Sequence, residues 1–271
     1  MTEAAPVIMT DPARELVEFC EALYATDAAE ARGQDHLASK FGIVAWGPEF
    51  FQIIYTVSER INLLTDIIES LEIDTDYRNE MVAHVRDILV AFSGPTLRNP
   101  WEAHGRQHIG PLNTQPLKAI SGLVRTKVRY KKLSLDERNN IIIMSRQLKE
   151  WLCDHQLSEH DFIRQSIIDG LQQFEFRLQR LEWLGSGYAL ESLRSVIAAY
   201  MMLERVSLPT DVDPNFKAIL LRVENFTKNV YNSIKDVRDS VEVGDFILRA
   251  YGAGSLWLNA QPTVAGFLGG N

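Results

Sequence analysis

Apolar residues recur every three or four positions along much of this 271-residue chain, and this spacing constrains its fold more than any other feature. Such spacing gathers apolar side chains on one face of an α-helix, whereas a half-buried strand alternates them every second residue. The sequence therefore predicts an all-α protein built as a bundle of long amphipathic helices. The helical stretches lie at residues 12–26, 48–71, 76–92, 135–154, 158–184, 188–205 and 213–241.

Residues at the expected helix boundaries agree with this pattern. The segments 134–137 and 158–161 each place an acidic residue three positions after a serine, which is the arrangement of a capping box. Asp11-Pro12 and Asp213-Pro214 place an acidic N-cap before a proline at the first helical position. Gly185-Ser186-Gly187 separates two helical stretches and predicts a short turn between antiparallel helices.

The middle of the chain breaks the helical pattern. Residues 94–122 hold four prolines and four glycines, a density that we expect to prevent a long helix. This predicts a long irregular connection, and long ordered connections are often functional. We expect one helical domain over residues 1–249, with an irregular basic segment at 94–132 and a tail at 250–271.

Charge is distributed unevenly along the chain, whose formal net charge is −8. Residues 1–97 hold six basic and seventeen acidic side chains, which gives −11. Residues 98–132 hold eight basic side chains against Glu102 alone, which gives +7. Residues 133–271 hold fourteen against eighteen, which gives −4. The basic segment is therefore a candidate binding region.

Two hypotheses explain the basic segment. It could bind the phosphates of RNA or another polyanion, with Trp101, Tyr130 and histidines stacking on bases. Alternatively, it could pair with the acidic first third of the chain, within one molecule or across a homo-oligomer. The overall acidity favours pairing, because an acidic surface repels nucleic acid at long range. The candidate anion-binding residues are Arg106, Lys118, Arg125, Lys127, Arg129, Lys131 and Lys132.

Cysteine content and hydropathy indicate an intracellular protein. Two cysteines, Cys20 and Cys153, are too few for a disulfide framework and fit a reducing compartment. The first ten residues lack the basic and apolar regions of a signal peptide. No stretch of about 18 residues is continuously apolar, so we expect no conventional membrane span. These features predict a cytoplasmic location.

The sequence contains no complete catalytic or metal-binding motif. His104 and His108 are four residues apart, but Gly105 lies between them and any helix there would be short. The spacing of Cys153, His155 and a later histidine matches no standard zinc pattern. Phosphate loops, dinucleotide fingerprints and serine elbows are absent from the sequence. We therefore predict no bound metal and no cofactor.

Two segments, 78–84 and 98–104, share the pattern R-N-x-x-x-x-H. This pattern resembles the Arg-x4-6-His motif of the HEPN ribonucleases. That family is all-α and often belongs to toxin–antitoxin and phage-defence systems. The resemblance implies a metal-independent endoribonuclease in which arginine and histidine converge on the scissile phosphate, usually across a dimer.

Geometry separates the two segments. Six residues of regular helix turn through about 600°, so Arg78 and His84 would point about 120° apart. We therefore expect a solvated arginine and an unrelated histidine there. Arg98 and His104 lie in the basic segment, where the chain could bring them together beside a phosphate. The resemblance makes them candidate catalytic residues, with Asn99 orienting them.

The final 22 residues carry no charge and five glycines. Polar residues and glycines within them make a poor membrane-spanning helix. We expect the tail to pack on the protein or on a partner, so that deleting residues 251–271 lowers stability or changes the oligomeric state. The candidate interface residues are Leu256, Trp257, Leu258, Phe267 and Leu268.

Three functional hypotheses follow. The first is a non-enzymatic binding protein that contacts a partner protein, a second copy or a polyanion through the basic segment and the tail. The second is the endoribonuclease that uses Arg98 and His104. The third is a membrane-active effector whose tail inserts after a trigger.

Overall fold

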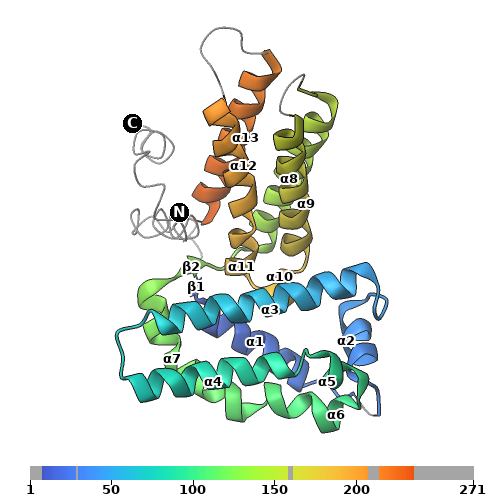
Figure 1. Ribbon diagram of the computed structural model, residues 1–271, viewed down its shortest axis with the longest axis vertical. Coiled ribbons are helices and arrows are strands. Elements are labelled where there is room, and N and C mark those ends of the chain that lie inside the picture. The colour runs from blue at the N-terminus through green and yellow to red at the C-terminus, as the bar shows by residue number, and fades with distance from the viewer. Residues whose placement is uncertain (1–7, 29, 158–160, 207–213, 235–271) are drawn as a thin grey trace, which may run out of the picture. The chain divides into compact units, whose positions relative to one another are not determined.

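The computed structural model describes residues 8–28, 30–157, 161–206 and 214–234, which are predominantly helical (Figure 1). The prediction of an all-α protein is thereby confirmed. The chain divides into two compact units. The N-terminal unit contains Thr10–Arg129 with Glu182–Gly185. The C-terminal unit contains Ile8, Met9, Tyr130–Leu181 and the described residues from Ser186 onward.

Four helices form the frame of the N-terminal unit. α1 packs against α7 and α3, while α4 packs against α3 and α7, so the four surround a common core (Figure 1). Leu16, Ile61, Val85 and Leu117 are fully buried and represent the four helices in that core. The bounds are α1 Pro12–Tyr24, α3 Pro48–Glu69, α4 Thr75–Val90 and α7 Pro111–Lys127.

Shorter elements complete this unit. α2 packs against α5, and α6 packs against the 3-10 helix η1, which also contacts α1, α4 and α7. Trp101 of α6 is fully buried and stacks on His36 of α2 with ring centroids 5.4 Å apart. The bounds are α2 Gly33–Phe41, α5 Gly94–Arg98, α6 Trp101–His104 and η1 Arg106–Ile109.

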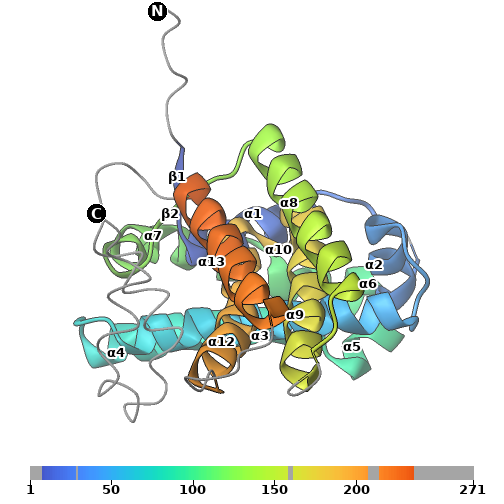
Figure 2. The ribbon, with the colours of Figure 1, turned by 90° about the horizontal axis from the view of Figure 1, so that it is seen from above.

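The C-terminal unit is a second ring of four helices. α9 packs against α8 and α12, and α13 packs against the same two helices (Figure 2). Across the ring, Phe174 of α9 meets Phe226 of α13 edge to face, with centroids 6.1 Å apart. The bounds are α8 Leu135–Asp154, α9 Asp161–Gln179, α12 Leu193–Val206 and α13 Pro214–Ile234.

Short elements also occur in and beside this unit. The glycine-rich break separates α10 (Leu181–Leu184) from α11 (Ser186–Glu191), and Gly185 adopts the left-handed φ of +80°. The long helices that flank this break, α9 and α12, pack against each other. The strands β1 (Met9–Thr10) and β2 (Tyr130–Lys131) pair in a two-stranded sheet.

Helix starts follow the local sequence. The Asp11 side chain accepts the amide hydrogen of Arg14 and so caps α1, where Pro12 occupies the first position. Ser134 and Glu137 form the predicted capping box at α8. α13 begins at Pro214 as expected. The predicted caps at 158–160 and Asp213 lie outside the described residues.

The middle segment is more regular than the sequence predicts. Up to Gly110 it contains only short helices, but from Pro111 the 17-residue helix α7 follows, so the expectation of no long helix is wrong there. Pro111 sits in the first turn, where no backbone donor is required. Pro116 removes one bond to the carbonyl of Leu112, a residue that is 75% exposed and accessible to water.

Two sequence predictions about organisation stay predictions. The single domain over residues 1–249 is not tested by the two units. The tail at 250–271, with all of its candidate interface residues, lies outside the described residues. Among the helices of the described residues, none is long and apolar enough to cross a membrane.

Candidate functional site

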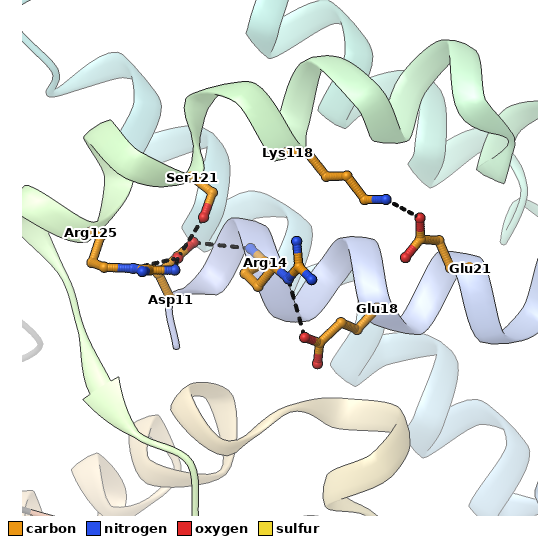
Figure 3. A network of polar contacts seen from close by, with 7 residues as sticks. All are labelled: Asp11, Arg14, Glu18, Glu21, Lys118, Ser121 and Arg125. Atoms are coloured by element: carbon orange, nitrogen blue, oxygen red, sulfur yellow. Dashed lines mark hydrogen bonds and ion pairs between the residues drawn. The ribbon is translucent and has the colours of Figure 1, made fainter. Parts of the chain in front are cut away.

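Several basic side chains of the middle segment pair with carboxylates (Figure 3). On α7, Lys118 pairs with Glu21 of α1, and Arg125 Nη2 lies 3.0 Å from Asp11 Oδ2. These two contacts join the basic segment to the acidic first third of the chain, which is the pairing that the second charge hypothesis describes.

The Asp11 carboxylate is the centre of the α1–α7 contact. It is fully buried and accepts hydrogen bonds from three directions (Figure 3). The Arg14 amide donates at 3.0 Å, the Ser121 hydroxyl at 2.7 Å, and the Arg125 guanidinium at 3.0 and 3.2 Å. A buried carboxylate is stable only with such partners. Asp11 therefore both caps α1 and ties it to α7.

Two further cations of the segment pair with nearby acids. Arg106 Nη1 lies 2.6 Å from Glu102 Oε2, and Lys131 pairs with Glu137. The hydrogen bond from Arg106, helped by the Ala28 amide, holds the pKa of Glu102 below its usual value. The same bond raises the pKa of Arg106.

The remaining candidate anion-binding residues lie at the end of α7 and beyond it. Lys127 and Arg129 are half-buried, and Lys132 is exposed while its backbone amide donates to Ile8. Anion binding by the segment stays a prediction. The proposed stacking of Trp101 and Tyr130 on bases is wrong, because these side chains are buried, at 0% and 4% exposure.

The candidate nuclease residues are not joined by contacts. The Asn99 carboxamide donates to the Pro95 carbonyl at 2.9 Å, so it orients neither partner. His104 is exposed, and its side chain makes no hydrogen bond or ion pair within the described residues. Arg98 instead lies over the ring of Trp46, 5.9 Å from the centroid. A shared phosphate site for Arg98 and His104 stays a prediction.

In the first R-N-x-x-x-x-H segment, Arg78 and His84 contact different residues, as the geometry of a helix predicts. Arg78 Nη2 donates to the carbonyls of Leu71 and Ile73, at 3.1 and 3.0 Å. Arg78 is therefore half-buried and holds the turn after α3, rather than being solvated. His84 faces a different set of partners, which are described below.

Arg98 belongs to an aromatic surface, here called the Trp46 patch: Trp46, Phe51, Tyr55 and Arg98. The Trp46 ring lies 5.7 Å from that of Phe51, and Tyr55 follows Phe51 one turn later on α3. Phe51 is 56% exposed and Tyr55 is 61% exposed. Trp46 has a φ of +60°, a left-handed conformation that is costly for a bulky side chain.

Helical spacing assigns the wrong phenylalanine of α3 to the core. Within the predicted helix at 48–71, the three-residue steps from Phe51 through Ile54 to Val57 predict that Phe51 and Ile54 are buried. In the structure Phe50 and Ile53 are fully buried instead, and Phe51 is exposed. Both phenylalanines satisfy a three-or-four spacing toward Val57, so the sequence leaves two faces open. The adjacent pair Phe50-Phe51 is the signal that one aromatic ring must leave the core.

A second cluster joins α4, η1 and α7 through hydrogen bonds; here it is called the histidine cluster: His84, Asp87, His108 and Asn113. Asn113 is 2% exposed, and its amide group donates to Asp87 Oδ2 at 2.6 Å and to the His108 carbonyl at 2.8 Å. His84 Nδ1 lies 2.9 Å from Asn113 Oδ1, and His108 Nδ1 lies 3.0 Å from Asp87 Oδ1.

These partners fix the tautomer of both imidazoles. Asn113 Nδ2 faces two acceptors, so its Oδ1 is the atom that faces His84, and His84 Nδ1 must donate. A carboxylate only accepts, so His108 Nδ1 donates to Asp87. Each neutral ring therefore presents a lone pair on Nε2, and the two side chains are 18% and 19% exposed.

Comparison with known proteins gives no further guide. No family model matches the chain, and no curated protein and no solved structure matches it.

Metal and thiol chemistry find no support among the described residues. Within them, no group of three or more His, Cys, Asp or Glu is placed to hold a metal ion. Burial raises the pKa of Cys20 to about 12, so this thiol is not a nucleophile at neutral pH. Cys153 is exposed and free.

Sequence reasoning missed Asp87 and Asn113, and it set His84 aside. The four residues of the histidine cluster span 30 positions and share no motif. The one signal in the sequence is Asn113, an asparagine in the first turn of α7 that comes five residues after His108. That signal is too common to identify a site.

Proposed function

We propose that this is a helical binding protein that docks a partner protein through the Trp46 patch. The observation that carries the proposal is Trp46 itself, a half-exposed tryptophan held in a left-handed backbone conformation between two phenylalanines. Strained backbone persists where surrounding structure or function requires it. A rigid aromatic side chain that is partly buried and partly accessible, as Trp46 is, is a typical anchor of a protein interface.

Composition of the patch supports a protein partner. Tryptophan, tyrosine and arginine are the residue types most enriched at interface hot spots. Arg98 has no carboxylate partner within the described residues, in contrast to Arg106 and Arg125. We therefore propose that the partner brings a carboxylate to Arg98 and apolar side chains to Phe51 and Trp46. The free thiols Cys20 and Cys153 fit a partner in the reducing cytoplasm.

Site-specific photo-cross-linking in the native cell tests this proposal. A photoreactive phenylalanine analogue at position 55 should give a discrete adduct with one partner. The same analogue at Phe162, an aromatic residue of α9 that is 61% exposed, serves as the matched control. The partner is then purified, and its affinity for the whole chain is measured by titration calorimetry.

Substitutions in the patch give the decisive readout. Trp46→Ala and Phe51→Ala should each weaken the purified complex by at least about tenfold. Phe162→Ala should leave the affinity unchanged. Equal affinities of wild-type protein and both patch variants, at unchanged melting temperature, would refute docking through this surface. Sedimentation of the protein alone shows whether the partner is a second copy.

A further inference from the structure

We propose that the histidine cluster is an acid–base catalytic site that cleaves single-stranded RNA without a metal ion. This inference goes beyond the proposed binding function and uses a different surface. It rests on the two imidazoles of His84 and His108, whose Nδ1 atoms face acceptors and whose Nε2 atoms face the side chains of Glu80 and Gln107. Imidazoles positioned in this way are the commonest general acids and bases in enzymes.

Asp87 gives His108 the environment of a general base. Its carboxylate oxygen lies 3.0 Å from Nδ1 and stabilises the imidazolium that forms when Nε2 takes a proton. Asn113 holds that carboxylate from the buried side at 2.6 Å. The side-chain nitrogen of Gln107 lies 3.4 Å from His108 Nε2, and Gln107 is exposed and free to move aside.

His84 has the environment of the complementary acid. Glu80 Oε1 lies 3.9 Å from its Nε2 and offers an ion-pair partner to the protonated ring. Asn113 links the two histidines: its carbonyl oxygen accepts from His84, and its amide holds the carboxylate that orients His108. One buried side chain thus positions both rings.

We expect the His84 imidazolium to attract the phosphate, against the charges of Asp87 and Glu80. Asp87 accepts hydrogen bonds from His108 and Asn113, while Arg86 of α4 lies 3.6 Å from Glu69 of α3. The cluster also lies at the start of α7, whose N-cap Gly110 has no side chain to neutralise the positive end of the helix. Glu80 of α4 also faces the cluster, with Oε1 3.9 Å from His84 Nε2.

RNA is the substrate class because its own 2′-hydroxyl is the nucleophile, so two imidazoles suffice. His108 Nε2 takes the proton of the 2′-hydroxyl as the 2′-oxygen bonds to phosphorus. The bond from phosphorus to the 5′-oxygen breaks, and that oxygen takes the proton from Nε2 of the His84 imidazolium. The products are a 2′,3′-cyclic phosphate and a 5′-hydroxyl, and proton exchange with water restores both rings.

The test uses the purified full-length protein, EDTA, and a short single-stranded RNA of mixed sequence labelled at its 5′ end. We expect cleavage to products that end in a 2′,3′-cyclic phosphate, identified by mass spectrometry, with a bell-shaped dependence of the rate on pH. An all-2′-deoxy strand of the same sequence should stay intact. His84→Ala and His108→Ala should each lose about 100-fold or more in rate.

His155→Ala is the matched control, since His155 is partly exposed, lies at the end of α8 and belongs to neither candidate site. His104→Ala is measured as well, to separate this site from the one predicted for Arg98 and His104. His155→Ala should cleave at the wild-type rate, and melting curves should show all variants folded; His108→Gln replaces any variant that unfolds. Asp87→Asn tests the positioning role, because it should shift the pH profile and leave RNA binding unchanged. The proposal is overturned if folded wild-type protein leaves the RNA intact, if EDTA abolishes cleavage, or if only His104→Ala removes it.

Discussion

Arg125 and Arg98 come from the same basic segment and meet opposite surroundings. The guanidinium of Arg125 donates twice to the buried carboxylate of Asp11, on a neighbouring helix. That of Arg98 lies over the ring of Trp46 and has no carboxylate partner within the described residues. The net charge of a segment therefore does not identify its role. What decides is whether the fold brings a carboxylate within reach of each cation.

The two arginines also differ in the surroundings that remain when the side chain is removed. Asp11 is fully buried, so its partners compensate a charge that water cannot reach. Trp46 and its neighbours are partly exposed, so the loss of Arg98 leaves side chains that water can reach and no buried charge. We therefore expect stability to depend on the first contact and partner binding on the second.

Removing the carboxylate should have the largest effect. Asp11→Ala deletes the cap of α1 and leaves Ser121 and Arg125 without their acceptor, so we expect a loss of about 3 kcal/mol in the free energy of unfolding. Urea denaturation measures it. Glu18→Ala, which removes the exposed pair with Arg14, is the control and should cost about 0.5 kcal/mol or less. Equal losses in both variants would contradict the central role of Asp11.

Removing the paired arginine should have an intermediate effect. Arg125→Ala leaves Asp11 with the Arg14 amide and the Ser121 hydroxyl, and the Arg125 side chain is 42% exposed. We expect a loss of about 1 kcal/mol, again measured by urea denaturation. If Arg125→Ala instead changes only the affinity for RNA, anion binding and not pairing is the role of this residue.

A paired arginine in the C-terminal unit extends the comparison to pH. Arg164 is buried and donates to the Asp161 carboxylate, and this bond holds the pKa of Asp161 below its usual value. A lowered pKa adds stability that is present above the unfolded-state value, near 4, and is lost as pH falls through the folded-state value. Asp161→Asn should therefore flatten the acid limb of a plot of melting temperature against pH. An unchanged limb would show that the pair adds no pH-dependent stability.

Removing the unpaired arginine should have the smallest effect on stability. Arg98→Ala deletes an exposed side chain with one aromatic contact, so we expect a change within about 0.5 kcal/mol. The affinity for the partner identified at the Trp46 patch should nevertheless fall. A large stability loss, comparable to that of Arg125→Ala, would remove the contrast between the two arginines.

The all-α fold and several helix starts could be predicted from the amino-acid sequence alone. Apolar spacing and caps act within one or two turns, so Asp11-Pro12, the capping box at Ser134 and the start of α13 at Pro214 follow from local chemistry. The same local rules failed for α7. The prolines and glycines of α7 fall at positions that a helix tolerates. The number of prolines and glycines, on which the prediction was based, does not show where they fall in a helix.

Which side chains face one another could not be predicted from the sequence, because it depends on how the helices pack. Asp11 and Arg125 are 114 positions apart, and the histidine cluster draws its members from three elements. The choice between Phe50 and Phe51 likewise depends on which helices pack against α3. Helix packing selects one of several faces that the same apolar spacing allows, and this selection depends on contacts distant in sequence. The helices could therefore be predicted from the sequence, whereas the Trp46 patch and the histidine cluster form only when the helices pack together.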